Sequence, residues 1–339
     1  MAIGVWHLAC YRCQQAIDAF EQLPHEQMTS GWVSTQMARA YFEMSNYNEA
    51  ETLFKRIRER EPYRMDGQEY HSTLLWHLRR DAKISALARE LIAMNRNSPQ
   101  AWCALGNCFS LQRDRDNAMM CFERAIKIDP CFAYAYTLCG HERFSEEEWE
   151  RAQYYYRKAI HLDPRHYNAW YGLGMVYMRL DRVDVAEKHF LHAIAIHPNN
   201  PALICCLGMV YERLRDRARA VAVYARASQL DPRSTLVRFK HAKALMELGR
   251  NEEALRELTA AYQLAPREAN IHLLLGHVHQ RMGDRVTALR YYTWALDLTT
   301  RQRHVILEAI QRIDEGPAAN EGNVSVLTVG GGGDESVFI

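Results

Sequence analysis

The sequence predicts an all-α fold in which pairs of helices stack one after another into a solenoid. Three observations lead to this prediction. A 34-residue pattern recurs from residue 31 to residue 302 without any insertion. One position in the first half of the pattern and one in the second half hold small side chains. Larger apolar residues recur around them at helical spacing, so a continuous core forms only when neighbouring units stack.

The segment 167–200 shows the pattern most clearly. Positions 4, 7, 8, 11, 20, 24, 27 and 32 are taken by Trp170, Leu173, Gly174, Tyr177, Ala186, Phe190, Ala193 and Pro198. The first four share one face of a first helix and the next three share one face of a second. Gly174 and Ala186 let the two backbones approach closely, and Pro198 ends the second helix. This arrangement resembles the tetratricopeptide repeat, which implies a right-handed superhelix of helix-turn-helix units.

The same spacing predicts eight repeats within 31–302. They start at residues 31, 65, 99, 133, 167, 201, 235 and 269. Position 20 reads Ala50, Ile84, Ala118, Ala152, Ala186, Ala220, Ala254 and Ala288. Because Ile84 replaces the small residue, we expect altered packing in the repeat 65–98. Position 34 supplies the N-cap residues Ser30, Ser98, Asn200 and Ser234.

The ends of the chain depart from the full repeat. Residues 1–30 predict a partial repeat, so the chain is expected to begin inside an array. Residues 303–315 predict an amphipathic capping helix. Residues 316–339 contain four consecutive glycines and no helical period, and they predict a disordered tail.

Composition limits the classes of partner. A net charge of +1 over 339 residues gives no basic footprint for nucleic acid. No apolar run approaches the roughly 18 residues of a membrane span, and the N-terminus does not resemble a signal peptide. We therefore expect neither nucleic acid nor membrane as a partner. Nine cysteines without paired spacing suggest a reducing compartment.

Motifs for catalysis, metal or cofactor binding are weak. Cys10 and Cys13 form a single CxxC without a second pair, which favours buried thiols over a metal or redox site. His141 begins HExx but lacks the second histidine of a zinc motif. The pair Gly172 and Gly174 lacks the third glycine of a dinucleotide loop. We expect no enzyme activity and no cofactor.

A binding surface is expected on the concave wall, which first helices line in such a superhelix. Positions 2, 5, 9 and 12 form a stripe separate from the packing stripe. The candidate peptide-binding residues on it are Asn107, Tyr134, Thr137, His141, Asn168, Tyr171, Met175, Met209 and Glu212. Amides such as Asn107 and Asn168 suit a peptide backbone, and Met175 and Met209 adapt to apolar side chains. The alternative for each residue is a solvated helix face.

Longer strings resemble one family of repeat proteins. GWVSTQMARAYFE (31–43), NSPQAWCALGNCFSLQRD (97–114), FAYAYTLCGHE (132–142) and PRHYNAWYGLGMVY (164–177) are similar to the C-terminal repeats of the cell division cycle protein 27 family. Its members are subunits of the anaphase-promoting complex, a ubiquitin ligase of mitosis. The resemblance covers about residues 1–300. It implies a non-catalytic scaffold in the nucleus and cytoplasm, bound to other subunits of the complex.

The resemblance also implies a ligand. The family's groove captures the Ile-Arg C-terminal tails of coactivators and of a small processivity subunit. That groove maps onto the first helices that carry Asn107, His141, Asn168 and Tyr171. On charge alone, Glu212 or Glu142 is expected to meet the tail arginine. The family's N-terminal homodimerisation domain and long linker have no match in this sequence, so homodimerisation stays open and a fragment or a reduced form is expected.

Other functions of repeat arrays fit less well. Co-chaperone domains grip a terminal carboxylate with lysine at position 5, but that position reads Thr35, Glu69, Cys103, Thr137, Tyr171, Cys205, Phe239 and Leu273. The substrate-presenting arm of a glycosyltransferase should show a ladder of asparagines, whereas only Asn107 holds position 9. A generic adaptor is the remaining alternative.

Overall fold

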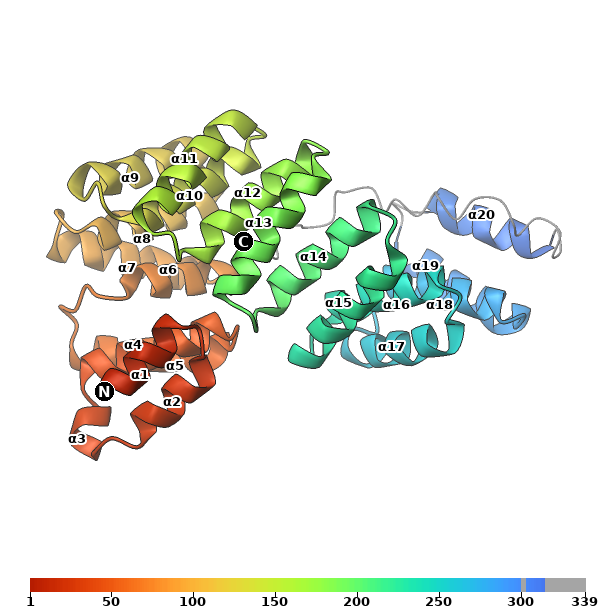
Figure 1. The fold of residues 1–339 in the computed structure, drawn as a ribbon, viewed down its shortest axis with the longest axis horizontal. Helices are drawn as coiled ribbons and strands as arrows, with labels where there is room; N and C mark the ends of the chain where they lie inside the picture. The colour runs from red at the N-terminus through yellow and green to blue at the C-terminus, as the bar shows by residue number, and fades with distance from the viewer. Residues whose placement is uncertain (300–302, 315–339) are drawn as a thin grey trace. The chain divides into compact units, whose positions relative to one another are not determined.

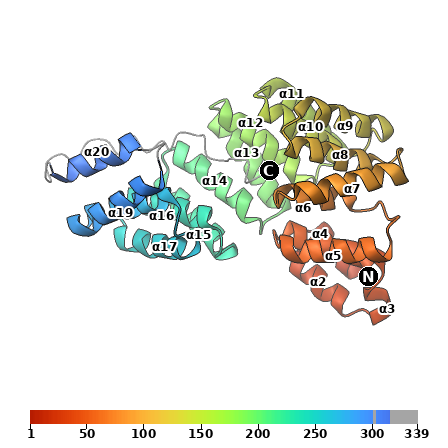
Figure 2. The same ribbon diagram turned by 180° about the vertical axis from the view of Figure 1, so that it is seen from behind.

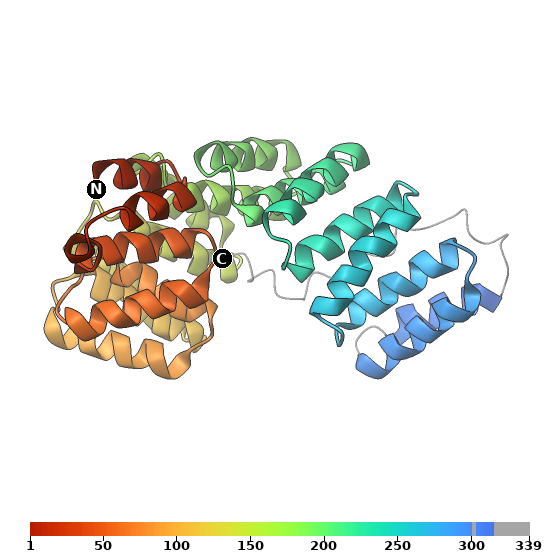
Figure 3. The ribbon, with the colours of Figure 1, turned by 90° about the horizontal axis from the view of Figure 1, so that it is seen from below.

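A computed structural model describes residues 1–299 and 303–314, and the regular structure within these ranges is α-helical (Figure 1). The predicted all-α solenoid is confirmed. Consecutive helices form hairpins that stack within each of two compact units, Met1–Asn200 and Pro201–Ile339 (Figure 2, Figure 3). No helix of the described part combines the length and the apolar character that a membrane crossing needs.

The first unit contains the helices α1 to α13. Their bounds are α1 Ala2–Ala9, α2 Cys13–Glu21, α3 His25–Met28, α4 Gly31–Glu43, α5 Tyr47–Arg60, α6 Gln68–His77, α7 Asp81–Met94, α8 Pro99–Leu111, α9 Arg115–Ile128, α10 Ala133–Ser145, α11 Trp149–Leu162, α12 Tyr167–Arg179 and α13 Val183–Ile196. First helices start at the expected repeat starts except for α6, which begins three residues late. Gly67 precedes it at φ +80°, a left-handed conformation that does not extend a helix. The four-residue α3 was not expected.

The second unit contains the helices α14 to α20. Their bounds are α14 Pro201–Arg213, α15 Arg217–Leu230, α16 Thr235–Glu247, α17 Asn251–Leu264, α18 Ala269–Arg281, α19 Arg285–Leu298 and α20 Arg303–Asp314. Ile306, Ala309 and Ile313 of α20 are buried against Leu273 and Tyr292, so this helix covers the last repeat. The expected tail at 316–339 lies outside the described residues.

Six of the helix pairs in the described residues are built around a ring that lies on a glycine. A Cβ atom added to Gly174 would lie 2.7 Å from the ring of Phe190, and one added to Gly106 would lie 2.3 Å from the ring of Phe122. The same contact joins Gly4 with Phe20, Gly140 with Tyr156, Gly208 with Tyr224 and Gly276 with Tyr292. Position 8 is therefore small because the residue at position 24 already occupies the space of its side chain.

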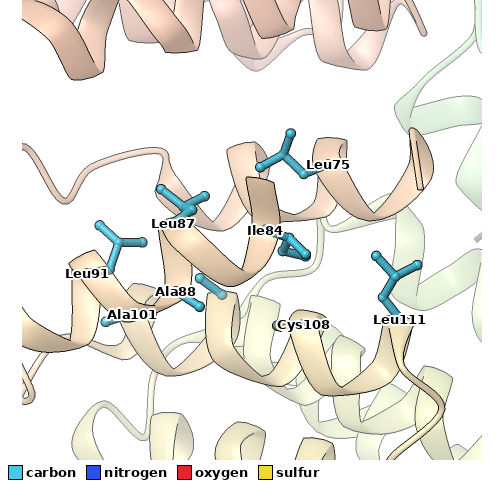
Figure 4. Packing of buried hydrophobic residues seen from close by; sticks show 9 residues of the cluster. Leu75, Ile84, Leu87, Ala88, Leu91, Ala101, Cys108 and Leu111 are labelled. Atoms are coloured by element: carbon cyan, nitrogen blue, oxygen red, sulfur yellow. The ribbon is translucent and has the colours of Figure 1, made fainter. Parts of the chain in front are cut away.

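The repeat 65–98 solves the packing differently (Figure 4). Ile84 fills position 20 and is fully buried, while position 24 shrinks to Ala88. Leu75, Leu87 and Leu91 complete the cluster around them. The large side chain is now at position 20 and the small one at position 24. The packing is altered as expected, and the core of this repeat stays filled.

Every turn between paired helices passes through one left-handed residue. Positive φ recurs at 34-residue steps, at Tyr11, Ser45, Arg79, Arg113, Glu147, Asp181, Arg215, Gly249 and Gly283. Only the two glycines adopt this conformation without steric cost. The others are exposed polar residues, except Tyr11, which is buried.

The glycine contact predicts a coupled pair of substitutions. Gly174→Leu should lower the free energy of unfolding by about 1–3 kcal/mol or more, because the new side chain enters the space of Phe190. Adding Phe190→Ala removes the ring, so the double variant should lose less than the sum of the two single losses. Urea unfolding followed by circular dichroism measures the cycle. Strict additivity would contradict the contact.

The left-handed turn predicts a stabilising substitution. Arg113 is exposed at φ 63°, so Arg113→Gly should raise the free energy of unfolding by about 0.5–1 kcal/mol. The matched control is Gln112→Gly, one residue earlier at φ −78°, which should lower it by about 0.5–1 kcal/mol. Thermal unfolding compares the two, and equal signs would count against strain at this position.

Candidate functional site

The candidate residues lie on four first helices. Asn107 is on α8, Tyr134, Thr137 and His141 are on α10, and Asn168, Tyr171 and Met175 are on α12, all in the first unit. Met209 and Glu212 are on α14 in the second unit. The spacing of the repeats thus brings the first seven to successive first helices, as the sequence predicts.

Asn107 and Tyr134 bind neighbouring first helices. The Asn107 Nδ2 donates to Ser72 Oγ at 2.9 Å and to Thr73 Oγ1 at 3.0 Å. The Tyr134 hydroxyl lies 2.6 Å from the same Thr73 Oγ1. These polar groups therefore tie α8 and α10 to α6. The structure differs here from the expected free wall, because a polar side chain at position 9 reaches the preceding first helix.

His141 and Thr137 also make contacts inside the unit. The His141 Nδ1 lies 2.9 Å from the hydroxyl of Tyr156 on α11. Burial lowers the pKa of His141 to about 3, so its ring is neutral at physiological pH. The Thr137 hydroxyl donates to the carbonyl of Ala133 at 3.2 Å.

The remaining candidates differ in exposure. Tyr171 and Met175 are 3% and 6% exposed. Asn168, the second residue of α12, is half-buried. In the second unit Met209 is half-buried, and Glu212 lies 3.9 Å from the ammonium group of Lys240. Glu142 is buried and accepts a hydrogen bond from Ser110. Asn168 is thus the most available amide on α12, and the peptide-binding role of the set stays a prediction.

A contact between distant repeats was not predicted. Tyr11, at the turn between α1 and α2, stacks on His197 with ring centroids 4.7 Å apart and meets the ring of Tyr167 edge-on at 5.2 Å. The Tyr11 hydroxyl donates to the backbone carbonyl of Arg165 at 3.4 Å. The Arg165 guanidinium returns a hydrogen bond to the carbonyl of Ala9 at 2.6 Å.

Glu43 at the end of α4 extends this contact. Its Oε2 accepts a hydrogen bond from the Tyr167 hydroxyl at 2.7 Å, and its carbonyl oxygen lies 3.3 Å from His197 Nε2. Glu43 is 6% exposed, and burial raises the pKa of its carboxyl. We call the residues Tyr11, Glu43, Arg165, Tyr167 and His197 the closing contact. It joins the first helices of the unit to its last helix pair.

Two opposite charges near the closing contact have atoms without a hydrogen-bond partner. Within the described residues, Arg39 Nε on α4 and Glu69 Oε2 on α6 are buried and unpaired. The Arg39 guanidinium lies 4.9 Å from the centroid of the Tyr70 ring. Burial raises the pKa of Glu69 to about 7. From the sequence, Glu69 was considered only because it holds position 5, where co-chaperone domains have lysine.

Of the two CxxC cysteines, Cys10 lies in the turn after α1 and is half-buried, so the expectation of a buried thiol was wrong for it, whereas Cys13 begins α2. Cys13 is 4% exposed and packs with Leu8, Ile17 and Phe20, and burial raises its pKa to about 12. Its thiol is therefore protonated and apolar in character at physiological pH. Across the described residues, no group of three or more histidine, cysteine or acidic side chains is placed to hold a metal ion.

Buried neutral histidines predict acid sensitivity. Burial lowers the pKa of five histidines of the first unit to about 3 or 4, namely His71, His77, His141, His166 and His197. Between pH 6.5 and 4 the unfolded chain binds more protons at these sites, so stability falls as the pH drops. The raised pKa values of Glu43 and Glu69 act in the opposite direction but are fewer.

We expect the free energy of unfolding to fall by more than about 3 kcal/mol from pH 7 to pH 4.5. His141→Gln should reduce the steepness by about one proton, whereas His161→Gln, which replaces an exposed ring, should leave it unchanged. Urea unfolding across the pH range measures both. A flat profile would contradict the buried neutral rings.

Comparison with known proteins places the chain among repeat proteins. A family model described as the cilia and flagella-associated protein 70 C-terminal domain matches residues 77–272, and tetratricopeptide repeat models match residues 35–62 and 271–306. The crystal structure of the APC/C hetero-tetramer Cut9-Hcn1 superposes with a TM-score of 0.74 at 19% identity, covering 88% of this chain and 58% of that chain. The PilF protein of Pseudomonas aeruginosa gives 0.57 at 21% identity, covering 64% and 96%. Both show the fold alone.

Curated relatives match at higher identity over shorter segments. Cell division cycle protein 27 homolog B of Arabidopsis thaliana is 51% identical over 132 residues, which are 39% of this chain and 18% of the relative. Anaphase-promoting complex subunit 3 of Schizosaccharomyces pombe is 45% identical over 150 residues, 44% and 23% of the two chains. The human cell division cycle protein 27 homolog is 48% identical over 130 residues, 38% and 16%. The chain thus matches less than a quarter of each relative's length.

The family model covers more than half of the 339 residues, and several of the curated relatives are named cell division cycle protein 27 homologs. The chain therefore belongs to the tetratricopeptide-repeat family that the cilia and flagella-associated protein 70 C-terminal-domain model describes, and it is a protein like cell division cycle protein 27.

Proposed function

We propose that the chain is a non-catalytic scaffold subunit of an anaphase-promoting complex, a multi-subunit ubiquitin ligase active in mitosis. The observation that carries this proposal is the 43–51% identity to proteins named cell division cycle protein 27 or anaphase-promoting complex subunit 3. Its partners are then other subunits of the complex, and it works in the nucleus and cytoplasm. The match to the fold of a chain from the Cut9-Hcn1 assembly is consistent with this role.

The ligand proposed for the inner face of the first unit is the C-terminal Ile-Arg tail of a coactivator. A helix face of half-buried amides beside apolar side chains suits an extended peptide, because amides bond its backbone while apolar contacts take its side chains. Asn168 supplies such an amide on α12, next to the apolar surfaces of Tyr171 and Met175.

A C-terminal arginine carries one negative and one positive group. Arg39 and Glu69 offer the matching charges on the neighbouring helices α4 and α6, and each has a buried atom without a hydrogen-bond partner among the described residues. The two groups attract each other, yet a buried polar atom without a hydrogen bond is costly, so a ligand that supplies bonds to both is favoured. The guanidinium of the tail would also return the Glu69 carboxyl to its ionised form, since burial raises its pKa to about 7.

A synthetic peptide ending in Ile-Arg tests the proposal. We expect a Kd on the order of micromolar, about −8 kcal/mol, by isothermal titration calorimetry. Asn168→Ala should weaken binding by about 1–3 kcal/mol if its amide bonds the peptide backbone. Glu69→Gln should weaken binding of the arginine-ended peptide but not of one ending in norleucine, whose side chain carries no charge.

The controls separate specific binding from adhesion. Asn199→Ala changes an exposed asparagine outside the inner face and should have no effect. A peptide with an amidated C-terminus and one with a scrambled sequence should both bind weakly. Equal affinity for these peptides would refute recognition of the tail, although the scaffold role would then still be open to a pull-down from mitotic extract.

A further inference from the structure

We propose that the closing contact is an autoinhibitory latch that holds the inner face of the first unit shut until it opens to admit a peptide. The contact joins α4, at one end of the row of first helices α4, α6, α8, α10 and α12, to the start of α12 at the other end. In this proposal, a peptide that lies across several of these helices enters between the joined ends. This inference rests on the proposed function, because it concerns access to the same surface.

The side chains of the latch depart from the repeat pattern at the places where they meet. Tyr11 holds the left-handed turn position at φ 54°, where the eight equivalent residues are exposed. A tyrosine there costs strain that a glycine would avoid, yet its ring is 9% exposed and stacked on His197. His197 replaces the Asp that follows the second helix at Asp129 and Asp163, and it is 2% exposed. Both halves of the stack are therefore particular to these two repeats.

The latch has the composition of a contact that can open. It contains few hydrogen bonds, and its edge is exposed to solvent at Arg165, which binds the Ala9 carbonyl. The buried carboxylate of Glu43 has its side-chain hydrogen bond from Tyr167, so opening returns a charged group to water. An apolar contact of the same size would lack this compensation on opening.

An irregular segment connects the first two full repeats of the unit. Residues 61–67 link α5 to α6, and they include Gly67 at φ +80°. α5 packs on α6 more sparsely than α7 packs on α8 or α11 on α12. Figure 2 shows the extended loop that connects α5 to α6. Leu74 of α6 nevertheless shares a buried cluster with α4 and α5, and His77 stacks on Tyr47, so opening of the latch has to proceed by bending at this packed boundary.

Two variants open the latch and one matched variant does not. Arg165→Ala removes the exposed bond to Ala9. Tyr11→Gly removes the stacked ring and also relieves the left-handed backbone, so the α1–α2 hairpin should keep its helices. The control is Tyr177→Phe, because Tyr177 lies on α12 like Tyr167, is equally buried at 7% exposure, and accepts its hydrogen bond from Arg157 of the adjacent α11.

The experiment measures opening and binding on the full chain. Amide hydrogen exchange in residues 2–21 and 165–175 should speed up in Arg165→Ala and Tyr11→Gly but not in Tyr177→Phe. The Kd for the Ile-Arg peptide should fall about tenfold in the two latch variants, because affinity scales with the fraction of open molecules. Circular dichroism checks that helix content is kept, and Arg165→Ala decides the result if Tyr11→Gly does not fold.

The outcomes distinguish this inference from the proposed function. Faster exchange with unchanged peptide affinity would overturn the latch and leave tail binding intact. Unchanged exchange in both variants would overturn it as well. If the peptide binds neither the parent chain nor an opened variant, the proposed ligand is wrong, and the proposal that the latch controls its access is refuted as well.

Discussion

The contact between an aromatic ring and a glycine sets the geometry of most repeats in the described part of this chain. The ring at position 24 of a second helix lies where the side chain at position 8 of the first helix would be, as Phe190 does over Gly174. Because the ring needs that space, the helix pair has one distance and one crossing, and these fix the direction in which the next pair stacks. The inner faces of the first helices line up as a result. Tyr156 shows the extent of the constraint, since it meets Gly140 of its own pair and Gly172 of the next.

The same constraint explains why the inner face is partly occupied. When first helices are held this closely, polar side chains such as Tyr134 at position 2 and Asn107 at position 9 reach another first helix. Asn107 therefore bonds Ser72 and Thr73, which sit on the preceding first helix α6. Asn168 lies on a half-buried part of α12 and is more available. The stripe contains residues that hold the wall together as well as residues that a peptide can reach, and spacing alone assigns both to one face.

The sequence was sufficient for contacts inside and between adjacent repeats. The residue types at the positions of Gly174, Ala186 and Phe190 recur every 34 residues, so the residues that they contact can be predicted from the spacing. The large side chain of Ile84 also predicted altered packing in its repeat. The closing contact was missed because its partners are 124 to 186 residues apart and obey no period. The one indication in the sequence was Tyr11, an aromatic residue at a turn position that is otherwise polar or glycine. The delayed start of α6 was missed because Gly67 lies inside a repeat whose other features are already weak.

A contact of this kind favours one arrangement of repeats more than it adds stability. Glu43 is removed from water, accepts a hydrogen bond from Tyr167 and interacts with the charge of Arg39. A buried carboxylate held in this way gains no more than an apolar pair of equal size would. Tyr11 adds backbone strain to the same contact. Yet Tyr11, Tyr167 and His197 fit only one another, because rings at fixed angles and a directed hydrogen bond tolerate little displacement. Low net stability combined with a single geometry is the property that a two-state element requires, since both of its states must lie within reach of a ligand's binding free energy.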